Sequence, residues 1–131
     1  MDGEPLTADT GIKTAQTIAE LKADSSASVG DFYGIIDYET GHNSGTIFGT
    51  VVAGDTGADD GGSFIDLNNG LQLKQDLGVL TVKKFGAAGV ITDNAVQFQN
   101  TVNYGAATKR NIGVNSDTYV IKSTPSYWSC L

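Results

Sequence analysis

Residues 82–95 read VKKFGAAGVITDNA, and this stretch divides the chain into two parts of different character. Upstream of it, runs of β-branched and aromatic residues are separated by glycine-rich turns, a pattern typical of short strands. Downstream of it, apolar residues recur at helical spacing: Ala95, Phe98 and Val102. Thr92 or Asp93 can cap the amino end of that helix. The stretch therefore marks the point where a β-rich region ends and a helix begins.

Two hairpins and a short helix are predicted upstream. The four strands are expected at residues 32–38, 46–52, 63–67 and 71–74. Asn68-Asn69-Gly70 connects the second pair, and within it Asn-Gly is the preferred dipeptide of a two-residue primed turn, because both positions tolerate positive φ. Thr17 and Glu20 have the spacing of a helix capping box. We therefore expect a helix that begins either near Ile12 or at Thr17 and ends near Ala23.

Downstream of the 82–95 stretch, the pattern is less regular. Short strands are expected at residues 79–82, 111–114 and 118–121. The sequence printed here closes with an aromatic segment that contains Tyr127 and Trp128.

The 82–95 stretch resembles the signature V-x-x-F-G-A-x-G-D-G-x-T-D-D-T-x-A, which opens right-handed parallel β-helices of the pectate-lyase-like superfamily. Phe98 lies where the helix of that signature continues, and residues 117–121 are similar to its first strand. The Asp-Gly of the signature is Val90-Ile91 here, and its second Asp is Asn94. The resemblance implies a turn and a helix that cap the open end of a β-solenoid and shield its edge strands and core from water.

A second pattern lies upstream. Residues 17–23, residues 29–33 and Tyr38 are similar to a small β-domain that precedes many phage depolymerase β-helices, and residues 60–65 with Asn69-Gly70 fit its ending. The two patterns together imply a homotrimeric phage tailspike. Its N-terminal part would bind the phage baseplate or another tail protein, and a β-helix beyond residue 131 would bind and cleave a host surface polysaccharide.

The implied fold is α+β and mainly β. A short N-terminal helix is followed by a small antiparallel β-sandwich or barrel-like domain, then by a capping helix with the first strands of a right-handed β-helix, in a homotrimer. Three regions are expected: a disordered N-terminus at 1–11, a β-rich virion-binding or adaptor domain at 12–79, and a cap helix with a first, truncated rung at 80–131. The implied location is the virion tail, after synthesis in the host cytoplasm.

Composition excludes several classes of function. The 131 residues include 8 basic and 15 acidic side chains, for a net charge of −7, so a nucleic-acid binder that relies on clustered Lys and Arg is not expected. No apolar run approaches the roughly 18 residues of a membrane span. Cys130 is the single cysteine, so neither an intrachain disulfide nor a zinc site with two thiolates can form. No cofactor is expected.

The acids and the single histidine are the residues from which a catalytic arrangement could be built. Asp59 with Asp60, or Asp31 with Asp37, could form a glycosidase pair only if the carboxyl groups lie roughly 5–9.5 Å apart across a sugar site. His42 lies in a turn between Gly41 and Asn43, where an exposed loop residue is expected. The acidic loop at 55–62 lacks the glycine that an EF-hand needs at its sixth position, which favours a solvated turn.

The size of the 80–131 region also argues against catalysis in this chain. About 25 residues follow the cap helix, while solenoid repeats take some 20 or more residues each and about three are needed to close a core. The favoured hypothesis is therefore a non-catalytic attachment and trimerisation module. The alternatives are a polysaccharide lyase or hydrolase with a compact site, and a carbohydrate-binding module that stacks sugars on aromatic rings: Tyr33, Tyr38, Tyr104, Tyr119 or Trp128.

Two sets of residues are the candidates for function. The cap and interface candidates are Val82, Phe85, Gly86, Ala87, Asp93, Phe98, Val102, Tyr127 and Trp128. The candidates for loops that face the virion are Gly41, His42, Asn43, Asp59 and Asp60.

Overall fold

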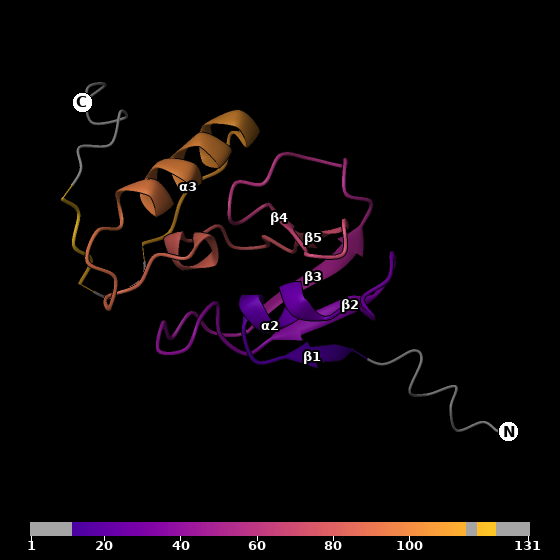
Figure 1. Ribbon diagram of the computed structural model, residues 1–131. Coiled ribbons are helices and arrows are strands. Elements are labelled where there is room, and N and C mark those ends of the chain that lie inside the picture. Colours follow the sequence, from indigo (N-terminus) through magenta and orange to yellow (C-terminus); the bar gives the residue numbers. More distant parts are fainter. Residues whose placement is uncertain (1–11, 115–117, 123–131) are drawn as a thin grey trace, which may run out of the picture.

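The computed structural model describes residues 12–114 and 118–122 (Figure 1). In chain order the elements are β1 (Lys13–Ala15), α2 (Ile18–Ala23), β2 (Phe32–Ile35), β3 (Ile47–Val52), β4 (Phe64–Asp66), β5 (Gln72–Gln75), a 3₁₀ helix η1 (Val82–Phe85) and α3 (Ala95–Thr108). The predictions for residues 1–11, Tyr127, Trp128 and Cys130 lie outside the described residues. The fold is mainly β with a few helices, as the sequence predicted.

The described strands form one five-stranded sheet in the order β1-β2-β3-β5-β4. β1 pairs with β2 in parallel, and the other neighbours are antiparallel. The prediction of an antiparallel sandwich or barrel is therefore wrong for the described residues. Parallel neighbours need a crossover connection, and α2 with the loop at 24–31 supplies it. The sequence pattern did not reveal β1, because three residues are too few to show the alternation of apolar and polar side chains that identifies a strand.

Alternating burial along the strands defines an inner and an outer face of this sheet. On β3, Ile47, Gly49 and Val51 are buried, and the residues between them are more exposed. Val51 lies opposite Leu73 of β5, and Leu73 lies opposite Ile65 of β4, so the buried residues share the inner face. Ile18 and Leu21 of α2 pack against that face. Each such side chain, when fully buried, contributes about 1.5–3 kcal/mol.

The capping box at the start of α2 is confirmed. The Thr17 hydroxyl accepts a hydrogen bond from the Glu20 amide at 3.2 Å, and the Glu20 carboxylate accepts one from the Gln16 amide at 2.7 Å. The helix therefore begins at Thr17. The alternative start near Ile12 is wrong, because residues 13–15 pair with β2 instead.

Residues 68–70 join the strands β4 and β5, as predicted, but not through a two-residue primed turn. The Leu67 carbonyl accepts from the Gly70 amide at 3.3 Å, and the Leu67 amide donates to the Leu71 carbonyl at 2.9 Å. Gly70 has a φ of 86°, while Asn69 is not among the described residues with positive φ. This is a turn followed by a left-handed glycine. Asn69 instead uses its side chain, which accepts from the Leu71 amide at 3.1 Å.

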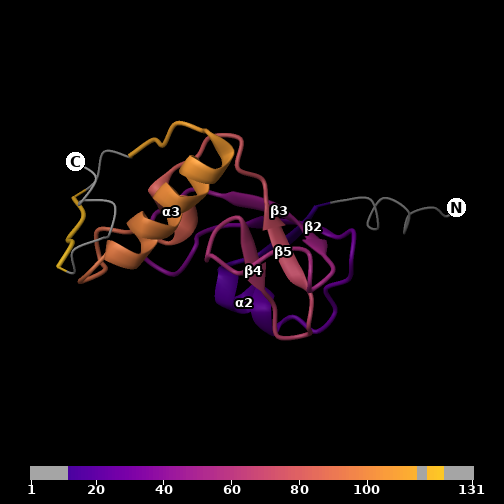
Figure 2. The same ribbon diagram turned by 90° about the horizontal axis from the view of Figure 1, so that it is seen from above.

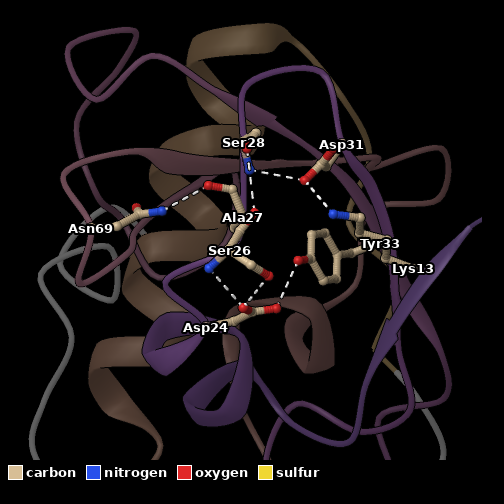
Figure 3. A network of polar contacts seen from close by, with 8 residues as sticks. All are labelled: Lys13, Asp24, Ser26, Ala27, Ser28, Asp31, Tyr33 and Asn69. Carbon is tan, nitrogen blue, oxygen red and sulfur yellow. Dashed lines mark hydrogen bonds and ion pairs between the residues drawn. The ribbon is translucent and has the colours of Figure 1, made fainter. Parts of the chain in front are cut away.

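A polar network fixes the crossover loop at 24–31 against the sheet (Figure 3). The Asp24 carboxylate accepts from the Ser26 amide and hydroxyl and from the Tyr33 hydroxyl. The second carboxylate, Asp31, accepts from the Lys13 ammonium and from the Ser28 amide, both at 2.9 Å. These bonds to neighbouring donors hold the pKa of both carboxyl groups below the usual value. The network thus ties β1, the loop and β2 together.

The region after the sheet contains less strand than predicted. Thr81 and Gly113 form a single parallel bridge, supported by a hydrogen bond from the Gly113 amide to the Leu80 carbonyl at 2.7 Å. The expected strands at 79–82, 111–114 and 118–121 are otherwise absent from the described residues. The backbone turns into η1 at Val82, which ends the pairing. α3 then lies away from α2 in both views (Figures 1 and 2).

Candidate functional site

Most of the predicted cap residues lie where η1 and the 86–95 segment meet the 37–45 loop, a region called the cap junction here. Val82 and Phe85 are 1% and 2% exposed, and Ala87 is fully buried. Phe85 packs so closely on Gly62 that a Cβ atom there would lie 2.4 Å from the Phe85 ring. The centroid of the Tyr104 ring of α3 lies 5.9 Å from the centroid of the Phe85 ring. Phe85 therefore joins the sheet region to α3. In this conformation it contacts other parts of its own chain and is not open to another subunit.

Gly86 requires both a special backbone conformation and the absence of a side chain. Its φ is 94°, the left-handed region, and it ends η1. A Cβ atom there would lie 2.9 Å from the ring of Tyr38. The Tyr38 hydroxyl donates to the Gly61 carbonyl at 2.6 Å, which holds the ring in place. Burial, with the nearby carboxylates of Asp59 and other residues, raises the pKa of Tyr38 to about 12.

The expectation that His42 is exposed is wrong. The side chain is only 6% exposed and stacks on Tyr38, with 6.1 Å between ring centroids and 3° between the planes. The cause is the Asp37 carboxylate, which accepts hydrogen bonds from the amides of Asn43 and Ser44 and folds the loop back. Of the loop candidates, Gly41 and Asn43 are exposed on either side of the buried histidine.

Lys83 links this loop to the cap. It is 7% exposed, and its ammonium group donates to the His42 carbonyl at 3.2 Å. The same ammonium lies 5.9 Å from the centre of the Tyr119 ring. A buried cation needs such partners, because desolvation is costly. Lys83 lies beside Lys84 in the sequence, with no local signal of burial, and only the fold reveals its position.

Asn94 is a central residue of the junction that sequence analysis did not single out. It is fully buried. Its side-chain oxygen accepts from the Ala88 amide at 2.9 Å, and its side-chain nitrogen donates to the Val120 carbonyl at 3.1 Å. Its backbone amide donates to the same carbonyl at 2.7 Å. The departure from Asp in the family signature was the signal, since an amide can both accept and donate where a carboxylate only accepts.

Helix α3 buries a face that differs from the predicted one. Asn94 occupies the formal N-cap position, but the Asp93 carboxylate accepts the hydrogen bond of the Ala95 amide at 3.0 Å. Asp93 also accepts from the Lys122 amide at 3.0 Å. The fully buried helix residues are Ala95, Thr101 and Gly105.

Phe98 and Val102, by contrast, are half-buried. Phe98 lies edge-on to the Tyr119 ring, with 5.2 Å between centroids. Gly105 is buried because Ile112 packs over it, where a Cβ atom would lie 3.0 Å away. The buried stripe therefore follows Thr101 and Gly105 and leaves Val102 at its edge. The segment after α3, which contains Ile112, determines this by packing over Gly105.

The acids proposed as glycosidase pairs have structural contacts. Asp59 accepts from the amides of Gly61 and Asp66, at 2.8 and 2.9 Å. Asp60 accepts from the Gly62 amide at 2.9 Å and from the Ser63 hydroxyl. Asp31 and Asp37 belong to the two separate networks described above. Within the described ranges, no group of three or more His, Cys, Asp or Glu side chains could hold a metal ion.

No family model matches this sequence, and comparison with curated proteins gives no match. Solved structures do match. WceF of Pantoea stewartii, a glycan biofilm modifying enzyme with a bacteriophage tailspike-like parallel β-helix fold, is 14% identical with a TM-score of 0.70, over 85% of this chain and 17% of that chain. The tailspike protein of Acinetobacter phage vB_ApiP_P1 is 24% identical with a TM-score of 0.69, over 88% of this chain and 20% of that chain.

A third match is the enzymatically active domain of tailspike protein 2 of bacteriophage CBA120. It is 18% identical with a TM-score of 0.60, over 79% of this chain and 15% of that chain. This chain thus spans a fifth or less of the length of each of the three. No helix within the described ranges is long and apolar enough to cross a bilayer. The chain has the fold of a segment that phage tailspike proteins contain.

Proposed function

We propose that this chain is the non-catalytic N-terminal attachment and trimerisation module of a phage tailspike. It joins the virion, through a baseplate or other tail protein, to a downstream β-helix that binds and degrades a polysaccharide of the bacterial surface. The observation that carries the proposal is the tailspike fold over 88% of this chain, which corresponds to 20% of a tailspike protein. A match of that size supports a module of a longer tailspike rather than the whole protein.

The use of the polar side chains supports a structural role. The four acids considered as catalytic pairs all accept backbone amides, and so organise turns: Asp31, Asp37, Asp59 and Asp60. The buried His42 and Lys83 hold the cap junction closed. Groups committed in this way are poorly placed to exchange protons with a substrate.

Exposed valines on the cap side supply a surface for subunit contacts. Val90 and Val96 are each 67% exposed, and Val120 is 40% exposed. Val90 and Val120 line one hollow together with Gly89 and Thr118. Burying such side chains between subunits is favourable by about 25 cal/mol per Å² of apolar surface. The exposed Gly41, Asn43 and Asp59, on the loops of the 12–79 region, remain the candidates for the virion contact.

The oligomeric mass of the chain tests this proposal. Light scattering after size-exclusion chromatography is expected to give a trimer, and Val96→Glu is expected to give a monomer. Val29→Glu is the matched control, because Val29 is 62% exposed but lies in the crossover loop. A monomer at every concentration would refute the trimerisation role. Dissociation by both variants alike would refute the assignment of the surface.

A glycan-cleaving enzyme is the second candidate, because two of the matched structures are described as a glycan biofilm modifying enzyme and an enzymatically active domain. The test is release of reducing ends from a purified capsule preparation. The attachment module is expected to release none. If the pure 131-residue chain releases reducing ends and the Asp60→Asn variant does not, the chain is an enzyme and the proposed function is wrong.

A further inference from the structure

The outer face of the sheet, opposite α2, is only partly covered. The loop at 53–63 covers its β4–β5 end, where the Gln72 side chain exchanges two hydrogen bonds with the backbone of Gly57. Over β2 and β3 the aromatic rings of Phe32 and Phe48 remain 36% and 40% exposed. These rings stack with 5.9 Å between centroids. An aromatic platform therefore faces outward beside the covered end.

A groove of about 760 Å³ begins at this platform. Its floor is one row across the sheet, because Phe32 lies opposite Thr50 and Thr50 lies opposite Lys74. The facing wall consists of residues 76–78, Tyr104 and Arg110. The volume is within the range of roughly 300–1,000 Å³ typical of ligand sites.

The groove carries positive charge in a strongly acidic chain. Lys74 is exposed, and its ammonium group has no hydrogen bond or ion pair within the described part of the chain. Arg110 donates to the carbonyls of Leu77 and Gly78 and lies 6.0 Å over the Tyr104 ring, so it is held in place without an ion pair to any described residue. Lys84 lies close to both Arg110 and Asp76.

Among the side chains that line the groove, Lys74 and Arg110 are cationic and Asp76 is the one carboxylate, although the whole chain has a net charge of −7. Burial lowers the pKa of Lys84, and the nearby Asp76 opposes that shift more strongly than Arg110 adds to it. Complementary charge at such a site selects anionic partners and rejects cationic ones.

We propose that this groove is a docking site for an acidic peptide segment of a partner protein. Carboxylates of the segment pair with Lys74 and Arg110, and one apolar side chain packs on the Phe32 ring. Two cations beside a stacked aromatic ring suit a segment that carries carboxylates next to an apolar side chain, which favours an acidic peptide. The inference rests on the proposed attachment function and names the chemistry of the partner.

Titration of the 131-residue chain, followed by ¹⁵N–¹H correlation spectra, tests the inference. The probe is the peptide acetyl-EELFEE-amide, and acetyl-KKLFKK-amide is the charge-reversed control. The acidic probe is expected to shift the amides of Phe32, Thr50 and Lys74, while the basic control leaves them unchanged. Lys74→Glu is expected to weaken binding of the acidic probe by about tenfold.

Lys22→Glu is the matched control variant, because it makes the same charge change on α2, which packs on the inner face. It is expected to leave the affinity unchanged. Equal weakening by both variants, or shifts spread over the whole surface, would refute a specific site. Stronger binding of oligogalacturonate at the same amides would replace the peptide with a glycan. A trimer whose groove binds no peptide refutes this inference alone, whereas a monomer that binds the peptide refutes only the trimerisation role.

Discussion

Replacement of Gly86 by alanine gives the sharpest test of the cap junction. Two costs add at this position. The left-handed conformation, at a φ of 94°, costs an L-residue about 1–2 kcal/mol. The new Cβ atom would also lie 2.9 Å from the Tyr38 ring. That ring cannot move freely, because it is held between its hydrogen bond to Gly61 and the stacked imidazole of His42. Overpacking of this kind costs about 1–3 kcal/mol.

Gly41→Ala is the control that separates the two costs. Gly41 has a similar φ of 86°, but a Cβ atom there would meet nothing within 4 Å. Reduced entropy of the unfolded chain offsets either substitution by about 0.4–1 kcal/mol. We therefore expect a loss of about 1 kcal/mol for Gly41→Ala and about 2–4 kcal/mol for Gly86→Ala.

Urea unfolding at one fixed protein concentration measures both values, since association would otherwise change the apparent stability. In a Tyr38→Ala background, the extra cost of Gly86→Ala is expected to disappear. Equal losses for Gly86→Ala and Gly41→Ala in the native background would show that the Tyr38 ring yields, and the packing argument for the junction would then be wrong.

Three further predictions concern polar groups that make internal hydrogen bonds. Asn94→Ala is expected to lower the free energy of unfolding by about 2–3 kcal/mol in the same urea assay, because it leaves the buried Ala88 amide without its acceptor; a loss near zero would mean that water replaces the side chain. Hydrogen bonds from Ser26 and Tyr33 lower the pKa of Asp24, so its stabilisation is present above about pH 4 and is lost as the pH falls through the lowered folded pKa. Asp24→Asn should therefore flatten the fall of the melting temperature between about pH 4 and 2, and an unchanged slope would contradict this role. Burial, with the Asp24 carboxylate, raises the pKa of Tyr33 to about 12, so its contribution is present below about pH 10 and is lost as the pH rises toward 12. Thermal melts of Tyr33→Phe should lack that alkaline loss; a parallel decline in both proteins would assign it elsewhere.

Local chemistry in the sequence was enough to locate most of the sheet. Alternating β-branched and aromatic residues predicted both hairpins, and the observed strands lie within or one residue from the predicted ranges. Thr17 and Glu20 located the start of α2, because a capping box involves only neighbouring residues. The 82–95 pattern led to the tailspike fold that the solved structures share.

Turn details and helix faces were less predictable. Asn69-Gly70 identified the turn but not its type, since Asn69 is not at positive φ and its side chain accepts a hydrogen bond from the Leu71 amide instead. The apolar spacing of α3 predicted a helix correctly, yet the buried stripe follows Thr101 and Gly105. A threonine can be buried at no cost in hydrogen bonds when its hydroxyl bonds the preceding turn, as Thr101 does with the Gln97 carbonyl at 2.7 Å.

The sequence by itself determined where strands and helices form, because those signals act between residues a few positions apart. Only the tertiary structure decided that β1 enters the sheet in parallel, that His42 and Lys83 are buried together, and that Asn94 joins residues 88 and 120. The pairing of β1, the contact of Lys83 with His42 and the contact of Asn94 with residue 120 join residues 20 to 41 positions apart. For the cap residues the distinction matters most: the pattern identified Phe85 and Gly86 as important, but the packing of Gly62 and Tyr38 against them explains why.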